Sequence, residues 1–232
     1  MNRITVAVLY GGRSTEHSVS CVSAGAHRSH PGPALFEVIP LWITRSGVWT
    51  LGAPDVSGLR IIDRAMPVVD PRRPRVALGL SSDDRGVLRY ADGDRAGDEV
   101  ARVDVVFPVM HGTHAEDGTI QGLLELSGIP YVGPGVFASA AGMDKEFTKV
   151  VLGAAGLPIG RQVVLRPGTA TLSDADRDRL GLPLFVKPAR GGSSIACPPP
   201  PPVVPRPRPP PGPPGGGAWP PRGRGPAASI PR

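Results

Sequence analysis

Two nearly continuous apolar runs, at residues 4–10 and 103–110, constrain what this chain can fold into more than any other feature. Both are rich in β-branched residues, as expected for parallel strands that are buried on both faces. Each run is followed by a polar loop that contains glycine, at residues 11–16 and 111–118, and then by a helical pattern. Strands that alternate with helices predict an α/β fold with an open, mostly parallel sheet, in which ligands bind at the carboxyl ends of the strands.

Further elements are expected along the chain. Ser14 or Thr15 can cap the first helix, and the spacing of apolar residues puts Val19, Val22 and Ala26 on its inner face. A Gly-Pro-Gly sequence at 133–135 suits a boundary between two folding units. Strands are expected at 36–43, 48–51, 129–133, 158–165 and 184–187, helices at 120–126, 138–156 and 171–182, and peripheral loops with short strands at 52–100.

The sequence Lys187-Pro-Ala-Arg-Gly-Gly-Ser-Ser194 joins the end of an expected strand to a loop of small residues. The lysine supplies charge, the glycines let backbone N–H groups approach a ligand, and the serines add hydroxyl donors. This loop therefore suits the binding of a polyphosphate.

Residues 197–232 differ from the rest in composition: 16 are Pro, six Gly, five Arg and three Ala. Such a segment cannot bury enough apolar surface to offset chain entropy, so we expect it to be disordered with local polyproline II character. The four residue types share codons rich in G and C. Two interpretations follow, a frameshifted stretch of a GC-rich gene and a genuine Pro-rich linker or ligand tail.

The net charge of +6 belongs to this tail, because residues 1–196 hold 21 basic and 20 acidic side chains. A nucleic-acid partner is therefore not expected. The two cysteines, Cys21 and Cys197, form neither a disulfide framework nor a zinc spacing. The run at 4–10 is too short for the core of a signal peptide, and no stretch approaches a membrane span, which favours a soluble cytoplasmic protein.

The Gly11-Gly12 turn is open to more than one interpretation. A strand, a tight turn and a helix N-terminus can present backbone N–H groups to a ligand, whereas the simplest alternative is a structural turn with a surface glutamate, Glu16. A dinucleotide-binding turn fits poorly, because the third glycine and an acidic residue at the end of the second strand are missing.

Four motifs follow one another in order, at residues 8–20, 111–125, 129–145 and 185–195; their centres read Tyr-Gly-Gly-Arg-Ser-Thr-Glu-His, His-Gly-Thr-His-Ala-Glu-Asp-Gly, Gly-Met-Asp-Lys and Phe-Val-Lys-Pro-Ala-Arg-Gly-Gly-Ser-Ser. Together they resemble the D-alanine–D-alanine ligases of the ATP-grasp superfamily. The resemblance implies an N-terminal α/β substrate-binding domain at residues 1–136 and the beginning of an ATP-grasp domain at 137–196, followed by the disordered tail at 197–232.

The resemblance also implies a reaction. ATP phosphorylates the carboxylate of a first D-alanine, and the amine of a second attacks the acyl phosphate, which yields D-alanyl-D-alanine for peptidoglycan synthesis. The family uses Mg²⁺ or Mn²⁺ with ATP, works in the cytoplasm, and can form homodimers.

Five residues take roles by their match to the family's motifs. Glu16 is expected to bind the first D-alanine, and His111 to line the same pocket. Lys145 and Lys187 match the lysines that hold ATP phosphates, where a cation offsets the charge that develops during transfer. Ser193 matches the loop serine that closes over substrate and phosphate. The catalytic assignment is thus Glu16 and Ser193.

Three positions in the loop after His111 are not assigned a catalytic or binding role. Glu116 and Asp117 are interpreted as acids that fix the loop, since aspartate bonds nearby backbone N–H groups. Ala115 stands where the family usually has glycine; if the backbone there needs a positive φ, alanine costs about 1 kcal/mol.

The family's metal ligands and adenine-binding hinge have no match in this chain, so no metal site is assigned. The family interpretation is thus a truncated, inactive ligase chain, since phosphoryl transfer depends on metal ions and positioned cations. The alternative is a non-catalytic binding domain whose Pro-rich tail is a ligand for aromatic grooves.

Overall fold

The computed structural model describes residues 3–27, 34–168 and 171–192, which lie within one compact unit, residues 1–199. The tail and the predictions made for it fall outside the described residues. The expected boundary at 133–135 stays a prediction. Among the described residues, no helix is long and apolar enough to cross a membrane.

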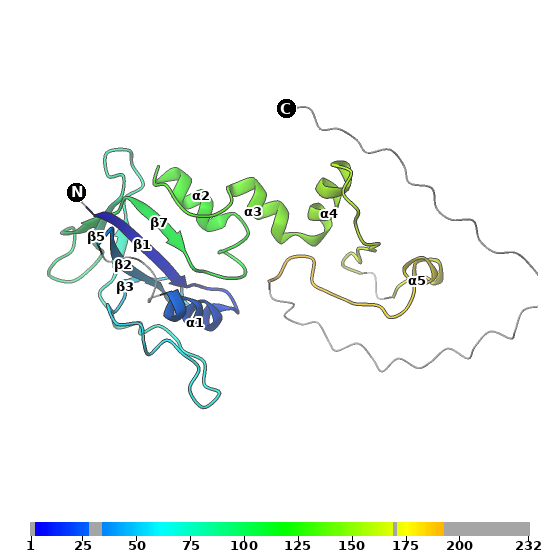
Figure 1. The fold of residues 1–232 in the computed structure, drawn as a ribbon, viewed down its shortest axis with the longest axis horizontal. Helices are drawn as coiled ribbons and strands as arrows, with labels where there is room; N and C mark the ends of the chain where they lie inside the picture. The colour runs from blue at the N-terminus through cyan, green and yellow to red at the C-terminus, as the bar shows by residue number, and fades with distance from the viewer. Residues whose placement is uncertain (1–2, 28–33, 169–170, 193–232) are drawn as a thin grey trace, which may run out of the picture. The chain divides into compact units, whose positions relative to one another are not determined.

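The main sheet has the strand order β3-β2-β1-β7 (Figure 1). Its strands are β1 (Ile4–Gly11), β2 (Phe36–Ile43), β3 (Trp49–Leu51) and β7 (Val105–Pro108). β1 pairs in parallel with both β2 and β7, and β3 returns antiparallel to β2 as the expected hairpin. Because β1 and β7 are parallel neighbours, the loops that follow them lie at the same edge of the sheet.

The peripheral region forms a second, antiparallel sheet of order β4-β5-β6. Its strands are β4 (Val76–Leu78), β5 (Val87–Tyr90) and β6 (Glu99–Arg102), which agrees with the short strands expected between residues 52 and 100.

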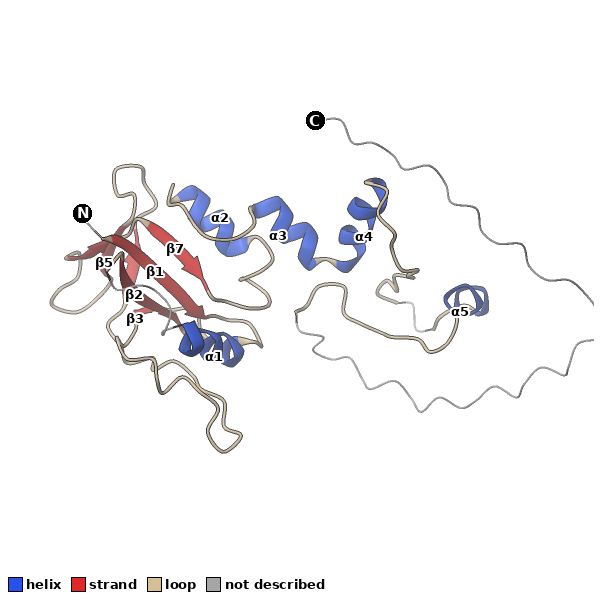
Figure 2. Ribbon diagram, in the orientation of Figure 1, coloured by secondary structure: helices blue, strands red, loops and turns tan. Residues whose placement is uncertain are grey.

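Five helices accompany the sheets in the described part of the chain (Figure 2). They are α1 (His17–His27), α2 (Thr119–Leu126), α3 (Val136–Met143), α4 (Lys145–Ala154) and α5 (Asp174–Leu180). Together with the mostly parallel sheet they confirm the α/β class.

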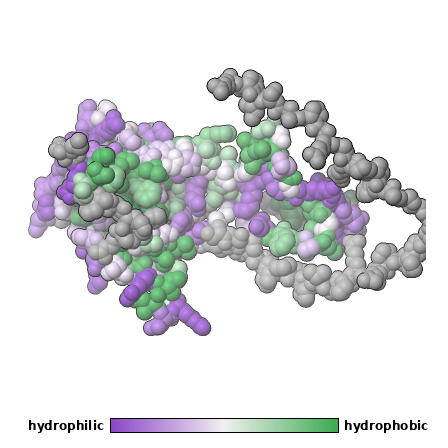
Figure 3. Space-filling view, viewed as in Figure 1, coloured by the Kyte–Doolittle hydropathy of each residue, from purple (hydrophilic) through white to green (hydrophobic). Residues whose placement is uncertain are grey.

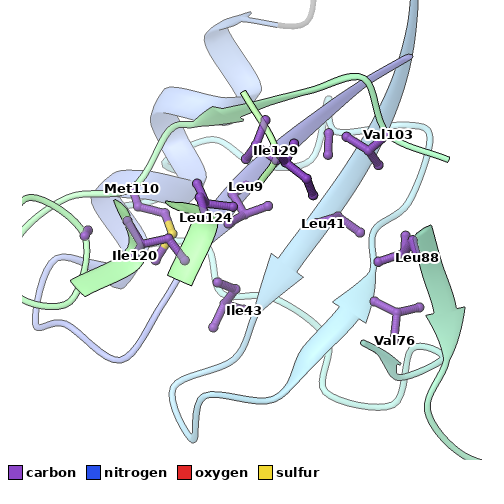
Figure 4. Packing of buried hydrophobic residues seen from close by; sticks show 13 residues of the cluster. Leu9, Leu41, Ile43, Val76, Leu88, Val103, Met110, Ile120, Leu124 and Ile129 are labelled. Carbon is purple, nitrogen blue, oxygen red and sulfur yellow. The ribbon is translucent and has the colours of Figure 1, made fainter. Parts of the chain in front are cut away.

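The core of the main sheet forms two clusters. One joins Leu9 of β1 and Leu41 of β2 to Leu124 of α2 (Figure 4). Val106 of β7 belongs to the same cluster. The other lies against α1 and contains Tyr10, Trp42, Cys21, Ala24, Val56, Leu59, Val69 and Val109. The sheet is therefore packed against α2 in one cluster and against α1 in the other.

The expected inner face of α1 is wrong. Ser20 and Cys21 are completely buried, whereas Val19 is 42% exposed. Hydrogen bonding explains the difference, because the Ser20 hydroxyl accepts the Gly11 N–H at 2.8 Å and donates to the Val109 carbonyl at 2.5 Å. A buried serine with two backbone partners at the strand ends therefore sets the rotation of the helix.

The prediction of a single helix at residues 138–156 is also wrong, because the helix is broken at Asp144. Asp144 has an extended backbone, with φ −93° and ψ 108°, and its side chain accepts the N–H groups of Glu146 and Phe147. An aspartate that caps a new helix competes with continuation of the old one. α3 therefore ends at Met143 and α4 begins at Lys145.

Two expected strands, at 158–165 and 184–187, are not strands in the structure, and the strand expected at 129–133 is a single bridge between Val106 and Tyr131. A strand requires a neighbour for its backbone hydrogen bonds, and within the described residues neither 158–165 nor 184–187 has one. Apolar side chains remain exposed in this region, including Phe137 at 75% and Phe185 at 67%. Figure 3 shows apolar surface over α4.

Candidate active site

The Gly11-Gly12 turn fixes the entry to α1. Both glycines have positive φ, 90° and 99°. A Cβ added to Gly11 would collide with the Ile43 carbonyl of β2, and one added to Gly12 would lie 2.8 Å from the Met110 methyl. Side chains are thus excluded here by both conformation and space.

Glu16 follows this turn and is only 3% exposed. Its loop is tied to the loop after β7 by Ser14, whose hydroxyl accepts the Glu16 N–H at 2.8 Å and donates to the His111 carbonyl at 2.7 Å. Ser14 thus fixes the turn that precedes α1, which begins at His17, and its expected role as the cap of this helix stays a prediction. The sequence alone did not show that the same hydroxyl joins two motifs.

Glycines bring the loops close to the Glu16 carboxylate. Gly112 has φ 77°, and a Cβ added there would lie 2.7 Å from Ser14 Oγ and 3.0 Å from Glu16 Oε1. A Cβ added to Gly192 would collide with Glu16 Oε1 and lie 3.2 Å from the Gly112 Cα. The backbone at Gly192, next to Ser193 in the sequence, therefore contacts Glu16. Ser193 itself lies outside the described residues.

Lys145 is joined to the same loop. Its Nζ donates to the Gly191 carbonyl at 2.9 Å, and its backbone N–H donates to the Ala189 carbonyl at 3.0 Å. Asp144 and Arg190 form an antiparallel bridge, and Arg190 Nε donates to Asp144 Oδ2 at 2.7 Å. This hydrogen bond from Arg190 lowers the pKa of Asp144 below its ordinary value. The segment before Ser193 is thus held at the N-terminus of α4.

Lys187 lies on the approach to this segment and is exposed. Within the described residues, no hydrogen bond or ion pair joins its ammonium group to Lys145, to Glu16 or to any other residue. The expected role of Lys187 as one of two phosphate-binding lysines stays a prediction.

His111 is half-buried, and its Nε2 lies 2.8 Å from the Ser23 hydroxyl of α1. The structure therefore joins His111 to the Glu16 loop through Ser14 and gives it Ser23 as a partner, while its role in lining a substrate pocket stays a prediction. Ser23 had no motif to mark it in the sequence.

His17 is a second residue that the sequence did not single out, although it adjoins Glu16. It is completely buried, with Nδ1 2.8 Å from the Gly12 carbonyl and Nε2 accepting the Val69 N–H at 3.4 Å. These partners require a proton on Nδ1 and none on Nε2. Burial lowers the pKa of His17, which favours this neutral form.

The two acids interpreted as fixing the loop do so. Glu116 accepts the Gly112 N–H at 2.6 Å, and Asp117 accepts the N–H groups of His114 and Thr119. Ala115 has no positive φ; His114, with φ 65°, takes the left-handed conformation instead. Ala115 is buried in the main core, so the strain considered for it does not arise.

A cavity of about 510 Å³ lies beside this site. It is bordered by the loop after β7, by α3 and α4, and by Arg190, with Phe137, Met143, Phe147 and Val151 as its apolar lining. The described residues contain no group of three or more His, Cys, Asp or Glu side chains placed to hold a metal ion.

Comparison with known proteins finds one family, whose profile is described as the D-ala D-ala ligase N-terminus and matches residues 5–134. A D-alanine–D-alanine ligase of Rhodococcus erythropolis is 60% identical over 194 residues, which cover 84% of this chain and 53% of that protein. One of Nocardia farcinica is 57% identical over 194 residues, with the same coverage. The chain thus spans about half the length of the curated relatives it matches.

Solved structures are similar as well. The D-alanine–D-alanine ligase of Coxiella burnetii is 32% identical with a TM-score of 0.67, covering 84% of this chain and 56% of that one. The VanG D-Ala:D-Ser ligase of Enterococcus faecalis is 30% identical with a TM-score of 0.65, covering 84% and 55%.

Proposed function

The chain belongs to the D-alanine–D-alanine ligase family, and we propose that it supplies the first half of an enzyme that joins two D-alanines at the expense of ATP. The observation that carries this proposal is the convergence of three segments on Glu16: the turn after β1, the loop after β7 at Gly112, and the backbone at Gly192. The first two of these follow parallel, neighbouring strands of the sheet.

We propose that Glu16 binds the ammonium group of the first D-alanine. A carboxylate that is 3% exposed gains more from a cationic partner than a solvated one does, because water screens the pair less. His111, held by Ser14 and Ser23, would line the same pocket. Ser193 would close over the substrate from the loop that Gly192 anchors.

Lys145 is proposed to bind a phosphate of ATP. Its ammonium group already points at the Gly191 carbonyl, beside the glycine and serine loop, and it has two further donors to offer a phosphate. Lys187, exposed and without a partner among the described residues, is proposed as the second phosphate ligand. Both would offset negative charge during phosphoryl transfer.

Magnesium or manganese, which the family resemblance implies, does not fit the described residues, since they present no cluster of ligands for it. No step is therefore assigned to a metal ion here. We propose that the residues which hold it lie in the part of the relatives that this chain does not match, and that the 232-residue chain alone does not turn over.

The proposed setting is peptidoglycan precursor synthesis in the cytoplasm, with D-alanine and ATP as substrates. The alternative of a binding domain with a Pro-rich ligand tail rests on residues 197–232, and no described contact favours it.

Direct binding tests the proposal for Glu16. We expect the 232-residue chain to bind D-alanine in preference to L-alanine in a calorimetric titration. Glu16→Gln should weaken binding by about 3 kcal/mol, or roughly a hundredfold, because it removes one charge of a buried pair. Asp83→Gln, at an exposed carboxylate, is the matched control. Equal binding of D-alanine by the wild type and Glu16→Gln would contradict the assignment, and D-alanine-dependent release of phosphate from ATP would contradict the proposed inactivity.

A further inference from the structure

His111 is held at two points by the segment that contains Glu16 and α1. Its backbone carbonyl accepts the Ser14 hydroxyl at 2.7 Å, and its Nε2 lies 2.8 Å from the Ser23 hydroxyl. Ser14 precedes α1, and Ser23 lies within this helix. One stretch of chain, residues 14–23, therefore orients both the backbone and the ring of His111.

Glu16 and Ser23 lie on the same face of α1. The Glu16 carbonyl accepts the Ser20 N–H at 3.0 Å, which joins Glu16 to the first turn of the helix. Seven residues make about two turns of an α-helix, so Ser23 lies two turns after Glu16 on that face. The helix therefore carries on one face both the proposed ligand of the substrate ammonium and the partner of His111.

The hydrogen bond with Ser23 determines which ring nitrogen of His111 carries the proton. A neutral imidazole has one N–H donor and one acceptor nitrogen, and a serine hydroxyl has a single proton to donate. Within the described residues, His111 is the one hydrogen-bond partner of the half-buried Ser23 side chain. The hydroxyl proton finds an acceptor there when Ser23 donates to Nε2, and this arrangement leaves the ring proton on Nδ1. The opposite arrangement, with Nε2–H as the donor, leaves the hydroxyl proton unpaired at a cost in free energy.

The second ring nitrogen of His111 is available to a ligand. Within the part of the chain that the structure describes, no hydrogen bond involves Nδ1. Gly112 follows His111 directly, and a Cβ added to it would lie 3.0 Å from Glu16 Oε1, so His111 adjoins the proposed ammonium site. An N–H donor suits the carboxylate that an amino acid carries beside its ammonium group, whereas the lone pair of an unprotonated nitrogen would repel that carboxylate.

We propose that Ser23 is a positioning residue, which donates to His111 Nε2 and thereby fixes the ring proton on Nδ1 as a donor to the carboxylate of the first D-alanine. Ser23 does not touch the substrate and acts through the orientation and the tautomer of His111. The statement about D-alanine rests on the proposed function. The statement about the ring proton does not, because it follows from a hydrogen bond within this chain.

¹⁵N NMR of the histidine rings tests the position of the proton. The spectrum of the 232-residue chain is recorded at about pH 9, well above the ordinary imidazole pKa of about 6.5, and the His111 signals are assigned by their loss in His111→Gln. We expect the wild type to carry the proton on Nδ1, and Ser23→Ala to raise the population that carries it on Nε2. Ser23→Thr keeps the hydroxyl group and should keep the proton on Nδ1.

Calorimetric titration of the same chains with D-alanine tests what the proton is for. Ser23→Ala should weaken the binding of D-alanine roughly fivefold, because the donor is no longer fixed towards the substrate. Ser23→Thr should bind within about twofold of the wild type. Ser18→Ala is the matched control, since it removes another hydroxyl of α1, one that accepts from Arg45 and does not contact His111. It should leave both the ring proton and the affinity unchanged.

The two measurements separate the possible failures. A wild-type His111 with its proton on Nε2 overturns the proposal without any variant. So does a Ser23→Ala chain that keeps the proton on Nδ1 or binds D-alanine as tightly as the wild type, and so do equal losses in Ser18→Ala and Ser23→Ala. A wild-type chain that binds no D-alanine contradicts the proposed function and the substrate role of His111, while the NMR spectrum still decides whether Ser23 fixes the ring proton.

Discussion

Ser14 holds the two loops of the candidate site together with one hydroxyl, which accepts from Glu16 and donates to His111. The position of the Glu16 carboxylate therefore depends on a residue that need not touch the substrate. Buried polar groups of this kind are costly to leave unpaired, about 1–3 kcal/mol each, so such a link between loops is rigid.

The burial of His17 leads to a prediction about how the stability of the fold depends on pH. Its pKa in the folded chain lies below the ordinary value of 6.5, because burial disfavours the imidazolium. The unfolded chain therefore takes up the proton first, and stability is lost as the pH falls from 6.5 through the folded-state pKa. We expect the urea midpoint of the wild type to fall across this window, and that of His17→Gln to fall less. Identical pH dependence in the two chains would contradict a neutral, buried His17.

At the scale of elements, Asp144 decides where one helix ends and the next begins. It caps α4 and also pairs with Arg190, so the helix start and the glycine loop share one carboxylate. Asp144 directly precedes Lys145 in the sequence, so the residue that caps α4 also adjoins the proposed phosphate site.

Substitutions of Asp144 should separate its two contributions. Asp144→Ala loses the cap and the ion pair and should reduce the free energy of unfolding by about 2 kcal/mol, whereas Asp144→Asn keeps a capping side chain and should lose less. The pKa of Asp144 is lowered by Arg190, so its charge stabilises the fold above the ordinary value of 3.8, and that contribution is lost as the pH falls through the folded-state pKa. Denaturation of the wild type and Asp144→Asn at several pH values measures this. A difference that does not shrink in acid would contradict the ion pair.

The elements also show what could be predicted from sequence. β1, β2 and the sheet edge that carries both loops follow from apolar runs and glycine turns. The buried face of α1 does not, because Ser20 has two backbone partners that periodicity cannot reveal. The break at Asp144 was missed for a related reason: a capping side chain acts within an otherwise helical pattern.

The candidate site, too, could be predicted from the sequence only in part. The four motifs identified Glu16, His111 and Lys145, which the structure brings together through Ser14 and the backbone at residues 191–192. The hydrogen bonds from Ser14 and Ser23 to His111 join residues that are far apart in the sequence. A single sequence holds no information about such contacts. Residues 184–187 have a strand's composition but no neighbour among the described residues, so composition alone mispredicted them.

At the scale of the whole molecule, this chain matches about half of its curated relatives' length. Apolar side chains such as Phe137 and Phe185 are exposed in the region that follows the N-terminal sheet. In the proposed enzyme, the part of the relatives that this chain does not match completes both the surface and the chemistry.

A chimera tests the central claim, that this chain carries the first half of a working D-alanine–D-alanine ligase with Glu16 at its substrate site. Residues 1–195 would be joined to the rest of the Rhodococcus erythropolis relative at the matching position, and formation of D-alanyl-D-alanine from ATP and D-alanine would be measured. We predict that the chimera forms the dipeptide and that Glu16→Gln lowers its kcat/KM about a hundredfold, while both unfold at the same temperature. A folded chimera that forms no dipeptide, or one that Glu16→Gln leaves fully active, would contradict the account.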